Sequence, residues 1–133
     1  MKTAVQKTFW LLCLIAWMSL MFYLSSVPGL SSGLSWDYVL RKIAHAGEYA
    51  VLTFLFYQNE KSWLDKLTMT KKLLLAFFLT IAYAASDEIH QYFVPNRHGT
   101  PIDLIYDGVG SLVMIWLISV WPRLRSYFLK GTK

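Results

Sequence analysis

A polar segment between two strongly apolar ones carries the side chains best suited to chemistry. It reads SDEIHQYFVPNRHGTPIDLIYDGVG, runs from Ser86 to Gly110, and contains four carboxylates, two histidines and one arginine. Carboxylates bind hard divalent cations through oxygen, and buried carboxyl or imidazole groups can transfer protons. Arginine binds phosphate in a bidentate manner. These residue types indicate acid–base or metal-assisted chemistry, or the binding of an anionic group.

A second polar stripe lies upstream, in the segment WDYVLRKIAHAGEYAVL. It contains Asp37, Arg41, His45, Glu48 and Tyr49, whose spacing of three to four residues places them along one face of a helix. At 1.5 Å per residue, Glu48 lies about 16 Å along that helix from Asp37. A charged group that faces lipid at this depth costs about 2.5–3.5 kcal/mol. We therefore expect this face to point toward other helices or toward water.

Four apolar runs are the elements that must position these residues. Hydrophobic residues make up 56% of the 133 residues and charged residues 16%, against about 45–50% and about 25% in soluble domains. A helix needs about 20 residues to cross the hydrocarbon core, and the two middle runs reach this length only with their polar flanks. Small residues such as Gly108 and Gly110 let such helices approach closely. We predict an all-α membrane protein, a four-helix transmembrane bundle in a single domain over residues 1–133, with spans at about 8–25, 36–57, 72–93 and 102–121.

The basic residues predict the orientation of the bundle. Ten of the 13 lysines and arginines fall at the N-terminus, in the loop after the second run and in the C-terminal tail, so both termini should lie in the cytoplasm. Six of the eight acidic residues then belong to the outward ends of spans two, three and four, where we expect a pocket. The bases flank apolar runs and form no recognition element, so we expect no nucleic-acid binding. The single cysteine, Cys13, excludes an intrachain disulfide.

The balance of charge in the outer half leaves two interpretations. Arg41, Lys42 and Arg97 could form ion pairs with part of the acid cluster and join the helices. Three bases do not neutralise six acids, however, so a protonated carboxyl, a histidinium or a bound cation must supply the rest, which favours a functional site. The candidate catalytic residues are His45, Glu48, Asp87, Glu88, Asp103 and Asp107, and the candidate substrate-binding residues are Arg41, Lys42, Tyr49, Gln91 and Arg97.

Roles can be assigned within this set. We expect Arg41 and Arg97 to bind an anionic group and His45 with Glu48 to relay a proton. The spacing leaves three classes open, namely chemistry on a lipid head group, proton-coupled transport, and lipid or drug binding without catalysis. Whether the protein is an enzyme stays undecided at this point. The candidates for holding a proton or a divalent cation, Mg²⁺ or Ca²⁺, are Asp87, Glu88, Asp103 and Asp107.

Three segments together resemble the VanZ-like family of small bacterial membrane proteins, which is named for an accessory factor in teicoplanin resistance. They are SSVPG, DYVLRKIAHAGEYAVL and SDEIHQYFVPNRHGTPIDLIYDGVG, and the resemblance covers residues 25–110. It implies a multi-pass protein of the bacterial plasma membrane with a role in the cell envelope. It carries the family's polar signature to Lys42, His45, Tyr49, Asp87, Glu88, Gln91, Arg97, Asp103, Asp107 and Gly110.

The hypothesis from sequence is therefore a VanZ-like envelope protein in contact with the lipid bilayer. Its outward acidic pocket would bind or modify a lipid-linked or phosphorylated envelope component and so influence susceptibility to glycopeptides such as teicoplanin. The alternatives are a non-catalytic binding or packing module in the membrane and a small proton-coupled permease. The identity of the ligand and of any metal, and the oligomeric state, do not follow from the sequence.

Overall fold

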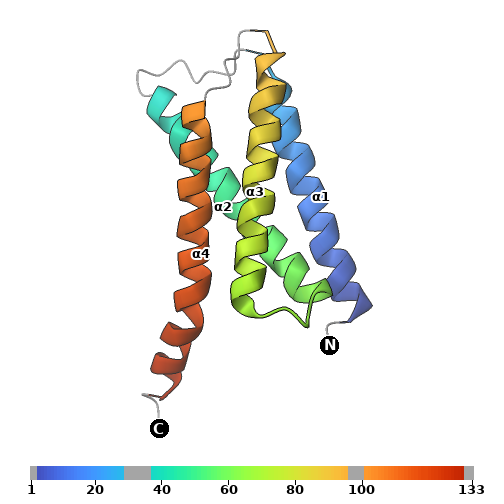
Figure 1. Ribbon diagram of the computed structural model, residues 1–133, viewed down its shortest axis with the longest axis vertical. Coiled ribbons are helices and arrows are strands. Elements are labelled where there is room, and N and C mark those ends of the chain that lie inside the picture. Colours follow the sequence, from blue (N-terminus) through green and yellow to red (C-terminus); the bar gives the residue numbers. More distant parts are fainter. Residues whose placement is uncertain (1–2, 29–36, 96–100, 131–133) are drawn as a thin grey trace.

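The computed structural model describes residues 3–28, 37–95 and 101–130, and these residues form four α-helices. The helices α1, α3 and α4 run along the long axis of the molecule, and α2 crosses behind them at a slant (Figure 1). The start of α1 and the end of α4 lie at the same end of the bundle (Figure 1). The all-α prediction is confirmed for the described residues, with α1 at Ala4–Ser26, α2 at Asp37–Trp63, α3 at Met69–Tyr92 and α4 at Pro101–Lys130.

Local sequence signals define where the helices begin. Thr3 Oγ1 accepts a hydrogen bond from the backbone N–H of Gln6, and the Gln6 side chain accepts one from the backbone N–H of Thr3. This capping box starts α1. Thr68 caps α3 by accepting a hydrogen bond from its first turn. α4 begins at Pro101, which has no N–H to leave unpaired, and Asp103 lies in the first turn, where the helix dipole favours an acid.

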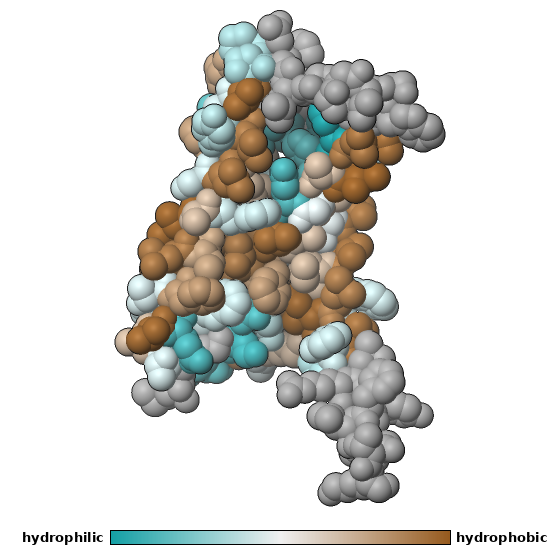
Figure 2. Space-filling model, turned by 180° about the vertical axis from the view of Figure 1, so that it is seen from behind, coloured by the Kyte–Doolittle hydropathy of each residue, from teal (hydrophilic) through white to brown (hydrophobic). Residues whose placement is uncertain are grey.

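Three of the described helices are long and apolar enough to cross a membrane. They are α1, α3 and the part of α4 from Ile102 to Pro122. α2 is not among them, because polar and charged residues are frequent toward both of its ends. In Figure 2, apolar side chains cover much of the described surface and polar ones gather mainly toward its two ends. The prediction of membrane spans is thus confirmed for three helices, and a crossing by α2 stays a prediction.

α2 is the central helix of the bundle. It packs against each of the other three helices, most extensively against α4, whereas α1 packs only against α2 and α3 among the described elements. Burial of apolar side chains along these contacts holds the helices together at close packing. The largest apolar cluster joins α1, α2 and α3 through Leu14, Met21, Tyr49, Leu52, Leu55 and Ala84, and a smaller one contains Tyr57, Leu73 and Ala76.

A cluster of buried hydroxyl groups lies where α2, α3 and α4 meet. Thr53 Oγ1 is 2.8 Å from Ser111 Oγ and 3.1 Å from Thr80 Oγ1, and it also lies 2.8 Å from the backbone oxygen of Tyr49. All three hydroxyl side chains are completely buried. Hydrogen bonds between side chains are important here, because a buried hydroxyl without a partner is costly. The cluster therefore fixes the three helices relative to one another.

α2 and α4 approach each other closely at Gly110. A Cβ atom on Gly110 would overlap the backbone carbonyl of Ala46 in α2. A Cβ atom on Gly108 would instead lie 3.6 Å from Ile81 Cδ1, which is an ordinary van der Waals contact. The predicted role of small residues in close helix packing is confirmed for Gly110, where any larger residue must displace backbone.

Candidate functional site

The polar residues predicted from α2, α3 and α4 meet inside one end of the bundle. Asp87, Gln91, Asp103 and Asp107 are 6%, 4%, 7% and 0% exposed, and Tyr49 of α2 is completely buried. These residues lie on helices whose other faces are apolar. Because a polar group buried without a partner costs about 2–7 kcal/mol, they must find partners in one another or in a bound ligand.

Asp87 receives hydrogen bonds from its own helix and from α2. Gln91 Nε2 donates to Asp87 Oδ2 at 2.8 Å, and the Tyr49 hydroxyl donates to the same oxygen at 3.4 Å. The spacing of Asp87 and Gln91, four residues apart in one helix, brings their side chains together. Tyr49 and Gln91 thus orient Asp87 in this structure, and their predicted binding of a substrate stays a prediction.

Lys42 and Asp103 form an ion pair between α2 and α4. The Lys42 ammonium also lies 5.6 Å from the centroid of the Tyr106 ring, which is within the range of a cation–π contact. The pair joins the beginning of α2 to the beginning of α4. For these two residues the structure therefore agrees with the ion-pair interpretation, in which bases neutralise part of the acid cluster and connect helices.

His45, Glu88 and Asp107 form a second group, with one side chain from each of α2, α3 and α4. Their potential ligand atoms all lie within 4.8 Å of one another, and His45 Nδ1 is 3.5 Å from Asp107 Oδ1. The Tyr49 ring stacks beside the imidazole, with the ring centroids 6.3 Å apart. Imidazole and carboxylate groups are common metal ligands, so this group could hold a metal ion.

The four acidic residues predicted to hold a metal ion do not lie in one group. Glu88 and Asp107 belong to the group that could hold a metal ion. Asp87 is hydrogen-bonded to Gln91, and Asp103 is paired with Lys42. His45, which also belongs to the group with Glu88 and Asp107, was predicted from sequence to relay a proton and not to bind a metal.

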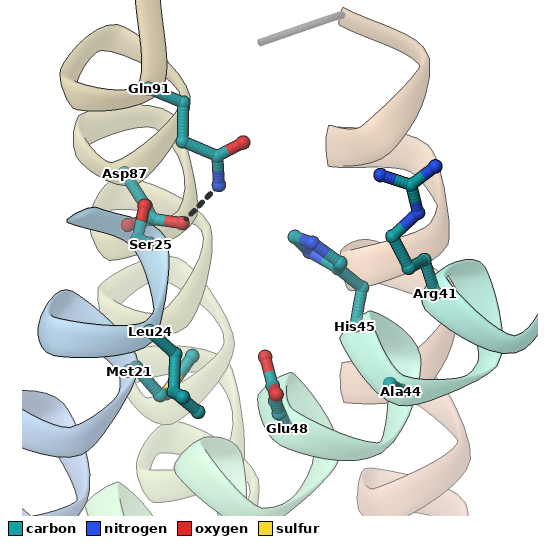
Figure 3. Close-up of a pocket in the computed structure, with 9 residues that line it drawn as sticks. All are labelled: Met21, Leu24, Ser25, Arg41, Ala44, His45, Glu48, Asp87 and Gln91. Carbon is teal, nitrogen blue, oxygen red and sulfur yellow. Dashed lines mark hydrogen bonds between the residues drawn. The ribbon is translucent and has the colours of Figure 1, made fainter. Parts of the chain in front are cut away.

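A cavity of about 90 Å³ lies beside His45. Figure 3 shows His45 and Glu48 extending from α2 toward α3, with Asp87 and Gln91 of α3 on the facing wall. Polar side chains therefore line two walls of the cavity. The third wall comes from α1 and consists of Met21, Leu24 and Ser25.

The cavity differs from the pocket predicted between spans two, three and four. Its described lining comes from α1, α2 and α3, whereas Asp103 and Asp107 of α4 are buried in contacts between helices. The reason is the central position of α2 and α3, which separates α4 from α1. Met21, Leu24 and Ser25 were not predicted to belong to the site, because nothing in an ordinary apolar span distinguishes the residues that line a cavity.

The two arginines predicted to bind an anion are in different situations. Arg41 lines the cavity, but its side chain is exposed, so its guanidinium lies at the rim (Figure 3). Such a position suits a group that binds an anion arriving from outside the bundle, because a guanidinium is always charged and presents its donors in a planar fork. Arg97 lies outside the described residues.

A family model described as VanZ/LLP1 matches residues 9–122 of the chain. No curated protein and no solved structure matches it. The matched region extends from α1 through most of α4, and it contains all the polar groups described above. The match therefore covers the fold and the candidate site together.

Proposed function

Because the chain belongs to the VanZ/LLP1 family, we propose that it binds the polar head group of a lipid-linked or phosphorylated component of the bacterial cell envelope. The chain is a multi-pass membrane protein. We assign it to the bacterial plasma membrane with both termini in the cytoplasm, as the distribution of basic residues indicates. In that orientation the end of the bundle with the cavity faces outward, toward envelope components.

A cavity that brings charged and polar side chains together with apolar ones, inside an otherwise apolar bundle, is the observation that carries this proposal. Its volume of about 90 Å³ corresponds to about three water molecules at about 30 Å³ each, so it accommodates a small polar group. Near it, Ile43 of α2 and Ile89 of α3 are each 64% exposed, and such surfaces favour contact with lipid chains. A ligand with a polar head and an apolar chain matches both features.

The charges around the cavity suggest how such a head group would bind. Arg41 at the rim would hold a phosphate, because its guanidinium is always charged and forms bidentate hydrogen bonds. Glu48 and Asp87 would repel a phosphate deeper in the cavity, but they accept hydrogen bonds from sugar hydroxyls or amines. The anion-binding role of Arg97 stays a prediction from sequence. Lys42 pairs with Asp103 and would act by orienting α4.

Direct binding tests the proposal. The full chain in detergent micelles would be titrated with a short-chain polyprenyl phosphate, and with the corresponding polyprenol as the control ligand. Arg41→Ala should weaken binding of the phosphate by about 10- to 150-fold, because a charged hydrogen bond contributes about 1.5–3 kcal/mol. Lys61→Ala is the matched control, since Lys61 is an exposed cation near the far end of α2. Equal affinity for the phosphate and the alcohol, or equal losses in the two variants, would contradict the proposal.

A cellular experiment separates binding from catalysis. The chain would be expressed in a glycopeptide-sensitive bacterium as wild type, His45→Ala, Asp107→Asn and Arg41→Ala, and lipid profiles and teicoplanin susceptibility would be compared. An enzyme should alter a lipid species, and His45→Ala and Asp107→Asn should abolish the change. A non-catalytic binding module should leave the lipid profile unchanged. If wild type reduces susceptibility and Arg41→Ala does so equally, the cavity has no part in that effect.

A further inference from the structure

The group of His45, Glu88 and Asp107 supports an inference beyond head-group binding. We propose that these three side chains hold one divalent transition-metal ion, of the class of Zn²⁺ or Mn²⁺, with at least one coordination position left open. Each residue comes from a different helix, so the ion would link α2, α3 and α4. The inference does not rest on the proposed function, because the metal site is defined by its own ligands.

The burial of Asp107 is the first argument. Its side chain is completely buried, and among the described residues neither carboxylate oxygen accepts a hydrogen bond. His45 Nδ1 lies 3.5 Å from Asp107 Oδ1, which is beyond the distance of a good hydrogen bond. A buried carboxylate needs pairing or a metal ion to offset its lost hydration. A cation between Asp107 and His45 meets that need.

The spacing of the potential ligand atoms is the second argument. Zn²⁺ binds imidazole nitrogen and carboxylate oxygen at about 2.0–2.2 Å, which puts neighbouring ligand atoms of a tetrahedral site roughly 3.4 Å apart. His45 and Asp107 already have nearly this separation. All the ligand atoms lie within 4.8 Å of one another, so Glu88 would need to move inward by roughly 1 Å, which side-chain rotation permits.

The chemistry of the ligands indicates the class of metal. Mg²⁺ and Ca²⁺ prefer sets made of oxygen alone, whereas an imidazole ligand favours transition metals such as Zn²⁺. Three protein ligands are also the number found in catalytic zinc sites, where a water or substrate takes the fourth position. We therefore favour a transition metal over the Mg²⁺ or Ca²⁺ expected from sequence. His45 also lines the cavity, so a ligand there would be close to the ion.

Metal content of the purified protein tests this inference. The full chain would carry a streptavidin-binding tag, because a polyhistidine tag would itself bind metal. After removal of metal with a chelator, it would be incubated with one equivalent of Zn²⁺, or of Mn²⁺, in an excess of Mg²⁺ and Ca²⁺, and bound metal would be measured by mass spectrometry. We expect about one transition-metal ion per chain, and a loss of affinity of at least about 10-fold in His45→Ala, Glu88→Gln and Asp107→Asn, since even outer-shell changes cause such losses.

His90→Ala is the matched control. His90 Nε2 lies 2.9 Å from Ser26 Oγ, and its ring stacks against Phe22, so it joins α3 to α1 without belonging to the proposed site. This variant should keep one bound ion. A Co²⁺-loaded wild-type protein should also show visible absorption that is lost in His45→Ala.

Three results would overturn the inference. They are the absence of stoichiometric transition metal from the wild type, retention of the ion by His45→Ala, and displacement of the ion by excess Mg²⁺ or Ca²⁺. Because Asp107 is buried and its replacement can disturb folding, the decision rests on His45→Ala and Glu88→Gln, whose side chains are half-buried. The two proposals can fail independently. Arg41→Ala should lose head-group binding and keep a normal metal content, and that result agrees with both proposals.

Discussion

Replacement of Gly110 by alanine should disrupt the contact between α2 and α4. A Cβ atom there overlaps the backbone carbonyl of Ala46, and backbone cannot rotate away as a side chain can. Overpacking of this kind costs about 1–3 kcal/mol, and a rigid neighbour places the cost toward the upper limit. The better helix propensity of alanine offsets up to about 1 kcal/mol of this destabilisation. The net destabilisation should therefore be about 2 kcal/mol.

Gly108→Ala provides the internal control on the same helix. Its new Cβ would lie 3.6 Å from Ile81 Cδ1 without overlap, so this change should be neutral or stabilise by up to about 1 kcal/mol. The two variants have the same composition, and we expect their stabilities to differ by about 3 kcal/mol.

Thermal unfolding in detergent, followed by circular dichroism, measures this difference. A loss of about 2 kcal/mol should lower the Tm of Gly110→Ala by roughly 5–10 °C. Because His45 precedes Ala46 in α2, displacement of this backbone should also reduce metal content. If Gly110→Ala and Gly108→Ala unfold at the same temperature, the reasoning from close helix approach is refuted.

Three further predictions address other parts of the chain. Burial raises the pKa of Glu60 from 4.5 to about 7 against the opposing charge of Lys72, so the folded chain keeps a proton that the unfolded chain releases. Stability should thus fall by at most about 3 kcal/mol as the pH rises from 4.5 through 7, and thermal scans of Glu60→Gln should lack that fall. Thr53→Val should lower the unfolding free energy by about 1–3 kcal/mol, because Thr80 and Ser111 lose a buried partner. The control Thr70→Val, at an exposed position, should lower it far less. Lys66→Cys in a Cys13→Ser background should react with a membrane-impermeant maleimide only after cells are permeabilised, and labelling of intact cells would reverse the predicted topology.

The helices and the meeting of the polar stripes were predictable because both depend on periodic patterns. Long apolar runs predict membrane helices from composition alone, and three of the described helices have that character. Polar residues three or four apart on such a helix must point inward, since lipid penalises them. The burial of Asp87 with Gln91, and of Asp103 with Asp107, follows from this argument.

The partners of each polar residue were less predictable, because they depend on how the helices cross. α2 crosses behind the other helices at a slant (Figure 1), and α2 and α3 both contact α1 and α4, which do not contact each other within the described helices. No periodicity in the sequence of α2 encodes that angle. The pairing of Lys42 with Asp103 and the grouping of His45 with Asp107 follow from the crossing. Thr53 is a clear example, since an isolated threonine in an apolar run gives no sign of a hydroxyl cluster.

The structure gives described neighbours to several of the acidic residues noted in the sequence. Asp103 has Lys42 as its ionic partner, and Asp87 is stabilised by Gln91 and Tyr49. Glu88 and Asp107 lie beside His45, and the potential ligand atoms of the three residues are within 4.8 Å of one another. A cation bound there would offset the lost hydration of Asp107, whose side chain is completely buried and whose carboxylate oxygens accept no hydrogen bond among the described residues. A metal ion thus fits both the spacing of the potential ligand atoms and the burial of Asp107 at the point where the helices meet, and this is why metal content, measured before any search for activity, is the most informative first experiment.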